Sequence, residues 1–281
     1  DILWLDPVDI AIGRLREITL RPGTPVRAMG AILFSFLKLK LRLAVAGFSP
    51  QLVDYDWRRS VIDLGREFAA HLAADGAAGA HVVAHSMGGL VARAALALPG
   101  EARIGRLVML GTPNSGSFAP VQALRGTYAV VRKLATLDQL HSAETLASEV
   151  YSSFPGLYEL LPAEGTTALD LFDAAVWPTR GPRPDAALLA AARSALRGLA
   201  GADARMTLIA GHARPTVTGV RRIARDFEYL VTRDGDGTVP LALAELPGVP
   251  TYYVRERHSE LTGNATVAAA VIDILRRGRT Q

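Results

Sequence analysis

The sequence predicts an α/β fold, in which a mostly parallel sheet carries helices on both faces and a helical cap is inserted into the chain. Short apolar runs, typical of buried strands, alternate with segments of helical spacing, and this alternation indicates a parallel sheet. Between residues 117 and 204 the alternation stops, and helical patterns and prolines occur without a strong strand pattern. Strand patterns return after residue 204, so we expect both ends of the chain to build one core.

The first part of the core is expected to contain three helices and three strands. Its first helix has Leu33, Leu37 and Leu41 on one face. Ser60 has the side-chain chemistry of an N-cap for the second helix. In chain order, the predicted elements are a helix over residues 26–46, a strand over 52–56, a helix from Ser60 to Asp75, a strand over 80–84, a helix over 87–98 and a strand over 104–110.

Residues 117–204 are expected to form a helical cap over the carboxyl ends of the strands, where open α/β sheets place their ligands. Such a cap can exclude water and contact an apolar substrate. The core is assigned to residues 1–116 and 205–281. In this second part, strand patterns cover residues 206–210, 227–231 and 251–254, and a helix covers residues 265–276.

The composition limits the chemistry that the chain can perform. With 281 residues, it is long enough for one large α/β domain, and its hydrophobic content of 49% is that of a globular protein. The lack of cysteine excludes disulfides and thiolate catalysis. The six histidines do not have the spacing of metal ligands, so we expect neither a metal nor another cofactor.

The net charge and the N-terminal sequence indicate which binding partners and which cellular compartment to expect. The net charge of +4 comes from arginines scattered along the chain, so nucleic-acid binding is not indicated, while transient contact with an anionic membrane is compatible with it. The apolar run over residues 28–37 is too short to cross a bilayer, and no signal peptide is visible. Because the chain opens on Asp1, we expect a processed or truncated boundary. The cytoplasm is the default location, and the oligomeric state is left open.

The most informative stretch is AHSMGG, residues 84–89, which lies between a predicted strand and a predicted helix. A serine at such a corner, flanked by small residues two positions away, is the nucleophile elbow of α/β-hydrolases. The sharp turn requires small side chains at Ala84 and Gly88. Ser86 is therefore the candidate nucleophile, and the backbone N–H of Met87 is the candidate oxyanion donor. The fold class is accordingly predicted to be the α/β-hydrolase fold.

The base that activates Ser86 is expected on a loop after a late strand, in the chain order serine, acid, histidine. His258 follows the last strand pattern and precedes the last helix, so it fits this place. His212, which follows an earlier strand pattern, is the alternative. We favour His258, because it leaves room for an acid on a separate loop between it and Ser86. His85 precedes the nucleophile and is expected to point away from the Ser86 hydroxyl.

The acid is expected in the glycine-rich loop RDGDGTVP, residues 233–240, which follows a strand pattern and carries two carboxylates. Asp236 lies between two glycines and is the preferred candidate, and Asp234 is the alternative. An Asp-Gly turn without a catalytic role is the purely structural interpretation. A calcium site is not indicated, because the loop has too few oxygen ligands at the spacing that calcium-binding loops require.

Four motifs, YDWR, AHSMGG, GTPNSGS and GDGTVP, occur in this order and together resemble the lecithin:cholesterol acyltransferase family. The resemblance covers most of residues 2–117 and 206–275, and GDGTVP and YDWR are its most diagnostic parts. It implies Ser86 as the nucleophile, Asp236 as the acid and His258 as the base. It also implies that the substrates are lipid esters, which are attacked to form an acyl-enzyme.

Two further residues are candidates for substrate contact. Trp57 offers a broad apolar face, and its neighbours Asp56 and Arg58 can pair to fasten the loop beside the site. For Trp57, a structural cluster without substrate contact is an equal alternative. Thr112, at the end of a predicted strand, is the second candidate, although a structural role is the stronger interpretation for it.

The resemblance also implies a glycine-containing oxyanion loop, after a central strand, just before residues 3–7, and the chain begins after that point. We therefore expect either that the N-terminal strand and this loop are missing from the sequence, or that the second oxyanion donor comes from elsewhere. The loss of one such donor costs about 3 kcal/mol of transition-state stabilisation.

The sequence thus predicts a serine-dependent acyl-ester hydrolase or O-acyltransferase of the lipase, esterase or phospholipase kind, acting on lipid esters through an acyl-enzyme on Ser86. Hydrolysis is preferred, because water needs no dedicated pocket, whereas acyl transfer needs an alcohol acceptor. The alternative is a catalytically impaired scaffold that binds lipid or protein. All three triad positions hold the residue types that catalysis requires, which favours the enzyme.

Overall fold

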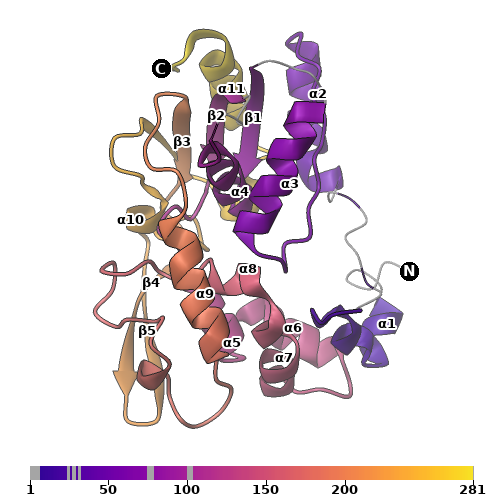
Figure 1. The fold of residues 1–281 in the computed structure, drawn as a ribbon, viewed down its shortest axis with the longest axis vertical. Coiled ribbons are helices and arrows are strands. Elements are labelled where there is room, and N and C mark those ends of the chain that lie inside the picture. The colour runs from indigo at the N-terminus through magenta and orange to yellow at the C-terminus, as the bar shows by residue number, and fades with distance from the viewer. Residues whose placement is uncertain are drawn as a thin grey trace.

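Four parallel strands form the central sheet of the protein, shown as a computed structural model in Figure 1. The structure describes residues 7–23, 26, 30, 33–74, 79–99 and 104–280. Within them the sheet order is β1-β2-β3-β6, and all neighbouring pairs are parallel. The carboxyl ends of these strands therefore meet at one edge of the sheet. The strands are β1 (Ala80–His85), β2 (Ile104–Leu110), β3 (Met206–Gly211) and β6 (Thr251–Val254).

Strand β2 illustrates burial on both faces of the sheet. Val108 and Leu110 lie in one hydrophobic cluster with the helices α2 (Leu33–Val45) and α11 (Ala265–Arg277). Leu107 and Met109 lie in another cluster, with α3 (Val61–Ala74) and α4 (Met87–Leu96). Because successive side chains of a strand point to opposite faces, a strand covered by helices on both sides is apolar on both faces, as residues 107–110 are. This is the pattern that predicted the parallel sheet.

Helix α2 buries a different face from the one that carries Leu37 and Leu41. Leu39 and Leu43 are buried in the cluster with α11, whereas Leu37 and Leu41 are exposed. The sequence of residues 37–43 is LKLKLRL, which places leucines on opposite sides of the helix. Such a sequence does not specify which side faces the core, and the packing against α11 decides it.

One strand prediction is wrong, and another is a strand that lies outside the parallel sheet. Residues 52–56, predicted as a strand, belong to neither sheet. Residues 227–231 do lie in a strand, β5 (Asp226–Thr232), but it pairs antiparallel with β4 (Thr216–Ile223) in a separate two-stranded sheet. The sequence does not predict β4, because a glycine and two arginines interrupt its apolar pattern.

A helical layer packs beside the loops at the carboxyl ends of the strands and lies below the sheet in Figure 1. Trp177 and Tyr158 are fully buried in its own hydrophobic cluster. The same cluster contains Leu15, near the N-terminus, and Phe227 of β5. The layer therefore shares its core with segments outside residues 117–204, and the domain boundaries stay a prediction. Its helices are α5 (Ala119–Leu124), α6 (Ala129–Leu137), α7 (Ala143–Glu149), α8 (Pro155–Tyr158) and α9 (Ala186–Arg197), joined by α1 (Pro7–Ala11).

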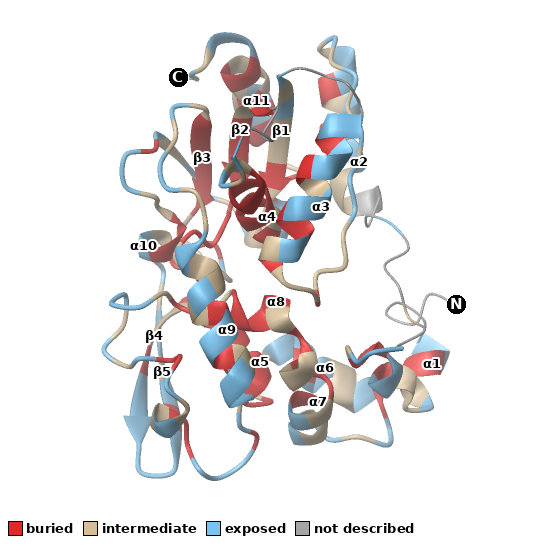
Figure 2. Ribbon diagram, in the orientation of Figure 1, coloured by how far each residue is buried: buried red, intermediate tan, exposed pale blue. Residues whose placement is uncertain are grey.

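Figure 2 shows that helix α4 is buried along most of its length. This helix carries a buried cation, Arg93. The Arg93 guanidinium donates hydrogen bonds to the Ala200 carbonyl at 2.9 Å and to the side-chain oxygen of Asn114 at 3.1 Å. Asn114 in turn donates to the Ala244 carbonyl at 2.8 Å, at the end of helix α10 (Leu241–Ala244). Burial lowers the pKa of Arg93 to about 10. These bonds tie α4 to the loop after β2 and to α10.

A buried carboxylate, Glu159, joins the helical layer to the start of α3. It is 3% exposed and accepts hydrogen bonds from the Ser60 hydroxyl at 2.8 Å and from the backbone N–H of Val61. These donors favour the ionised carboxylate, but burial has the larger effect and raises the pKa of Glu159 to about 7. The folded protein therefore holds this proton more tightly than the unfolded chain does.

We expect the free energy of unfolding to fall between about pH 5 and pH 8, by up to about 3 kcal/mol from Glu159 alone. A carboxyl with a raised pKa stabilises the fold most when it is protonated, below its ordinary value of 4.5, and this contribution is lost as the pH rises through about 7. In Glu159→Gln the neutral amide can serve both Ser60 and Val61, so the decline should be shallower by the same amount. Urea unfolding of the wild-type protein and of Glu159→Gln across this pH range measures the difference. Parallel pH profiles of the two proteins would contradict the raised pKa of Glu159.

Candidate active site

Ser86 occupies the corner between β1 and α4. Its backbone has φ 56° and ψ −130°, and among the described residues only Ser86 and Ala213 combine a positive φ with a side chain. The Ser86 N–H donates to the Leu110 carbonyl at 2.9 Å, which extends the pairing of β1 with β2 into the turn. A buried helix and a paired strand thus hold the serine in a backbone conformation that costs about 1–3 kcal/mol.

The tightest approach in this corner is at Gly89, one residue beyond the expected position. A Cβ on Gly89 would lie 2.1 Å from the Thr112 Oγ1 atom, which no side chain permits. A Cβ on Gly88 would meet only ordinary contacts, 3.4 Å from the Tyr55 hydroxyl and 3.8 Å from the Ala84 Cβ. Glycine at position 89 is therefore what lets the loop after β2 pass over the start of α4.

His258 connects Ser86 to Asp236. Its Nε2 atom is 2.8 Å from the Ser86 Oγ atom, and its Nδ1 atom is 2.7 Å from the Asp236 Oδ2 atom. An ionised carboxylate can only accept, so Nδ1 carries a proton and Nε2 is left to accept the hydroxyl proton of Ser86. The three side chains form a continuous hydrogen-bonded chain. His258 lies in a 3-10 turn (His258–Glu260) after β6.

The loop of residues 233–240 orients Asp236. The Asp236 Oδ1 atom accepts hydrogen bonds from the backbone N–H groups of Thr238 at 2.9 Å and Val239 at 2.8 Å. The carboxylate is therefore fixed with its second oxygen toward His258, and the residue is only 2% exposed. Asp234, the alternative acid, is exposed, and its Oδ2 atom accepts a hydrogen bond from Thr232.

Two glycines at strand ends make room for the acid and the histidine. A Cβ on Gly111 would lie 3.1 Å from the His258 Nδ1 atom, 3.2 Å from the Asp236 Oδ2 atom and 2.7 Å from the Leu261 Cδ1 atom. A Cβ on Gly211 would lie 2.7 Å from the Asp236 Cβ atom. Gly111 also has φ +57°, in the left-handed region. The GTPNSG motif thus begins with a residue whose lack of a side chain serves the site.

Two other histidines, His212 and His85, lie in different surroundings from His258. His212 donates its backbone N–H to the Val254 carbonyl at 2.9 Å and takes no part in the hydrogen bonds of Ser86 or Asp236. The Nε2 atom of His85 is 2.9 Å from the main-chain oxygen of His258, and the expected orientation of His85 away from the Ser86 hydroxyl stays a prediction. This contact could not be predicted from local sequence patterns, because it joins residues 173 positions apart.

The remaining candidates, Met87, Trp57 and Thr112, are predicted to lie near the corner between β1 and α4. Met87 is the first residue of α4, and its side chain is buried. Trp57 packs edge-to-face on Phe154 of the helical layer, with ring centroids 5.2 Å apart, and its role in substrate contact stays a prediction. Thr112 is 1% exposed and packs against Gly89, so a contact with substrate also stays a prediction.

The paired charges predicted beside Trp57 are present. Arg58 and Asp56 form an ion pair at 2.6 Å, and Arg58 also donates to the Ile18 carbonyl at 2.7 Å. The pair thus ties this loop to the N-terminal segment. The oxyanion loop expected before residues 3–7 lies outside the described residues.

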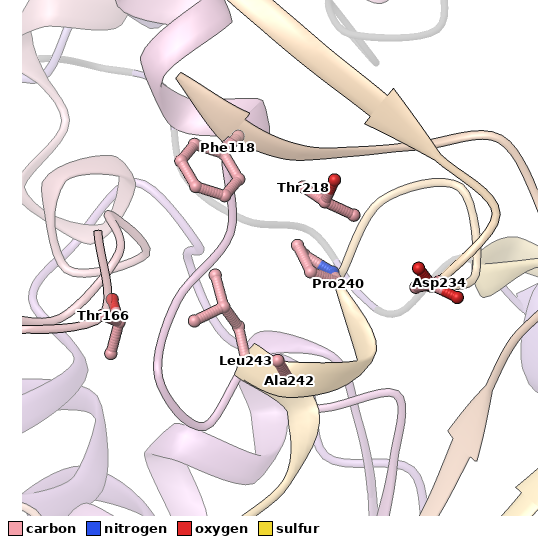
Figure 3. A pocket seen from close by; sticks show the side chains of 7 residues that line it. All are labelled: Phe118, Thr166, Thr218, Asp234, Pro240, Ala242 and Leu243. Carbon is pink, nitrogen blue, oxygen red and sulfur yellow. The ribbon is translucent and has the colours of Figure 1, made fainter. Parts of the chain in front are cut away.

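A separate pocket of about 200 Å³ opens between the helical layer, the β4–β5 hairpin and the acid loop (Figure 3). Neither Ser86 nor His258 is among the described residues that line it, so it is distinct from the hydrogen-bonded chain. Within the described part of the sequence, no cluster of three or more histidine, aspartate or glutamate side chains could hold a metal ion. The pocket is lined by Phe118, Thr166, Thr218, Asp234, Pro240, Ala242 and Leu243.

The parallel sheet, its helical layers and the strand–serine–helix corner define an α/β-hydrolase. Residues 27–263 match the model of the Alpha/beta hydrolase family, and the chain belongs to this family of hydrolases. This confirms the predicted fold class. The narrower resemblance to the lecithin:cholesterol acyltransferase family stays a prediction.

The solved structures that are similar to the chain include a chain of a protein complex and a lipase. A chain of the Tle4–Tli4 complex is 17% identical with a TM-score of 0.58, and the match covers 100% of this chain and 77% of that chain. The mature form of Bacillus licheniformis lipase BlEst2 is 14% identical with a TM-score of 0.49, and the match covers 83% of this chain and 82% of that chain. No curated protein matches the sequence. Among the described residues, no helix combines the length and the apolar character needed to cross a membrane.

We expect Gly111→Ala to break the hydrogen bond between His258 and Asp236, because the new methyl group would push against both partners. In the wild-type protein, this bond should give a strongly downfield proton resonance for His258 Nδ1–H, which Asp236→Asn assigns by removing it. The signal should be lost in Gly111→Ala. Gly47→Ala is the matched control, since Gly47 also has a positive φ of +90° but a Cβ there would meet nothing within 4 Å. A downfield signal that survives in Gly111→Ala would contradict this account.

Proposed function

We propose that the protein is a serine-dependent acyl-ester hydrolase that works through an acyl-enzyme on Ser86. The observation that carries this proposal is the hydrogen-bonded chain from the Ser86 hydroxyl through His258 to Asp236, with distances of 2.8 and 2.7 Å. A serine hydroxyl is a weak nucleophile by itself, and a base oriented by a carboxylate is the means of activating it. Membership of the α/β-hydrolase family supports the same reaction class.

In the first step, His258 Nε2 accepts the hydroxyl proton while the Ser86 oxygen forms a bond to the ester carbonyl carbon. The carbonyl oxygen becomes an oxyanion, and His258 becomes an imidazolium. The Asp236 carboxylate faces that cation through the Nδ1–H bond and stabilises its charge. The N–H of Met87, at the positive end of α4, donates to the oxyanion.

In the second step, the tetrahedral intermediate breaks its bond to the alcohol oxygen, and the His258 imidazolium gives its proton to that oxygen. The alcohol leaves, and the acyl group stays on Ser86. Water then attacks the acyl carbon, His258 takes one of its protons, and this proton returns to the Ser86 oxygen as the carboxylic acid is released. An alcohol in place of water would give acyl transfer with the same residues.

The substrate class proposed is a lipid acyl ester. The support is the resemblance of the YDWR and GDGTVP motifs and the helical layer that packs beside the strand ends. Among the two outcomes of the acyl-enzyme, we propose hydrolysis, because water needs no acceptor pocket. Transient contact with a membrane surface is part of the same proposal.

We expect Ser86→Ala and His258→Ala each to lower kcat by about 10⁵–10⁶-fold, and Asp236→Asn by about 10⁴-fold. The aspartate variant keeps more activity, because the nucleophile and the base both remain. Hydrolysis of p-nitrophenyl esters with short and long acyl chains measures these losses. His212→Ala is the matched histidine control and should keep wild-type kcat.

Two results would contradict the proposal. One is loss of activity in His212→Ala with activity retained in His258→Ala, which would assign the base to another loop. The other is a wild-type protein that neither hydrolyses esters nor reacts with a fluorophosphonate, which would favour the binding scaffold.

A further inference from the structure

His85, the residue before the proposed nucleophile, contacts His258, the proposed base, through both a hydrogen bond and its ring. Its Nε2 atom is 2.9 Å from the main-chain oxygen of His258. Its ring also packs against the His258 ring, with centroids 4.8 Å apart and planes tilted by 41°. The rings of Phe36 of α2 and His85 also lie edge-to-face, with centroids 6.1 Å apart. This residue takes no part in the reaction steps above.

We propose that His85 is a positioning residue for His258: its Nε2–H holds the main-chain carbonyl of the base, and its ring supports the imidazole of the base. The inference rests on the proposed function, because it concerns the residue that would activate Ser86. It assigns a role to a histidine that has no part in the proposed proton transfers between Ser86, His258 and Asp236.

The hydrogen bond fixes the tautomer of His85. A carbonyl oxygen can only accept, so the proton of the bond lies on His85 Nε2. Burial, and then the proximity of His258, lower the pKa of His85 to about 4. His85 is therefore a neutral donor at neutral pH. A second cation at 4.8 Å would oppose the imidazolium that His258 becomes during attack, and a neutral ring does not.

The hydrogen bond from His85 to the main chain of His258 matters because His258, the proposed base, lies on a loop. The His258 N–H also anchors this turn, since it donates to the Asp236 carbonyl at 2.9 Å. His85, in contrast, is the last residue of a strand whose neighbour β2 pairs with it through Leu110. The side chain of His85 thus links the loop of the base directly to the strand that carries the nucleophile. Misplacement of a reacting group by about 1 Å costs about 100-fold in rate.

The test compares His85→Phe with His85→Gln in the full chain. Phenylalanine keeps a planar ring but has no donor, whereas the glutamine amide nitrogen can reach the place of Nε2–H. We expect His85→Phe to lower kcat by about 10–100-fold with little change in KM, and His85→Gln to recover most of the loss. His81→Phe is the matched control, because His81 lies exposed on the same strand and should keep wild-type kcat.

A double-mutant comparison with Asp236→Asn separates a positioning role of His85 from a merely structural one. In an Asp236→Asn background, where His258 has lost its orientation, the added cost of His85→Phe should shrink to less than about 3-fold. Additive losses, or a wild-type kcat in His85→Phe, would overturn the inference. So would a loss in His85→Phe that His85→Gln fails to recover.

A measurement on the wild-type protein keeps the inference testable where a variant fails to fold. Nitrogen-15 spectra of the imidazoles should show His85 as the neutral Nε2–H tautomer at pH 7. An Nδ1–H tautomer, or an imidazolium, would overturn the inference. Failure of the proposed function has a different signature, since a wild-type protein that leaves esters and fluorophosphonates untouched would show the absence of the reaction itself.

Discussion

The hydrogen bond between Asp236 Oδ2 and His258 Nδ1 is the interaction on which the whole site depends. It joins two loops, one after the β4–β5 hairpin and one after β6, that the chain order separates. Each partner is held before it meets the other. Thr238 and Val239 orient the carboxylate with their backbone N–H groups, and His85 holds the main chain of the histidine. In its proposed role as the base, a histidine held in this way needs little reorganisation when charge develops on it.

Bringing these groups so close together requires small residues at the strand ends. Gly111 and Gly211 leave space for the Asp236 and His258 side chains, and Gly89 lets the loop after β2 cross the elbow. Ser86 itself is held at a positive φ by the strand and helix on either side. Buried contacts farther along α4, among them the hydrogen bonds of Arg93, tie this helix to its neighbours.

Much of this could be predicted from the sequence, because the relevant signals are local. Apolar runs reveal strands buried on both faces, and a serine between small residues marks a strand-to-helix corner. The structure brings Ser86, His258 and Asp236 together, as the order of elements suggested. The buried face of α2 could not be predicted, since its leucines lie on both sides of the helix.

The contacts that depend on tertiary structure escaped prediction for the same physical reason. Strand β4 is defined by its pairing with β5 and not by an apolar pattern of its own. The hydrogen bond of His85 joins a strand to a turn 173 residues later. The only local signal was the presence of a histidine, with a donor on a planar ring, directly before the candidate nucleophile.

The most direct measurement is mass spectrometry of the protein, quenched while it turns over an ester in the absence of an added alcohol acceptor. The account predicts an added acyl mass on the peptide that contains Ser86, which forms and decays as the ester is consumed. Ester consumption without any such adduct, or with the acyl group on a different residue, would contradict it.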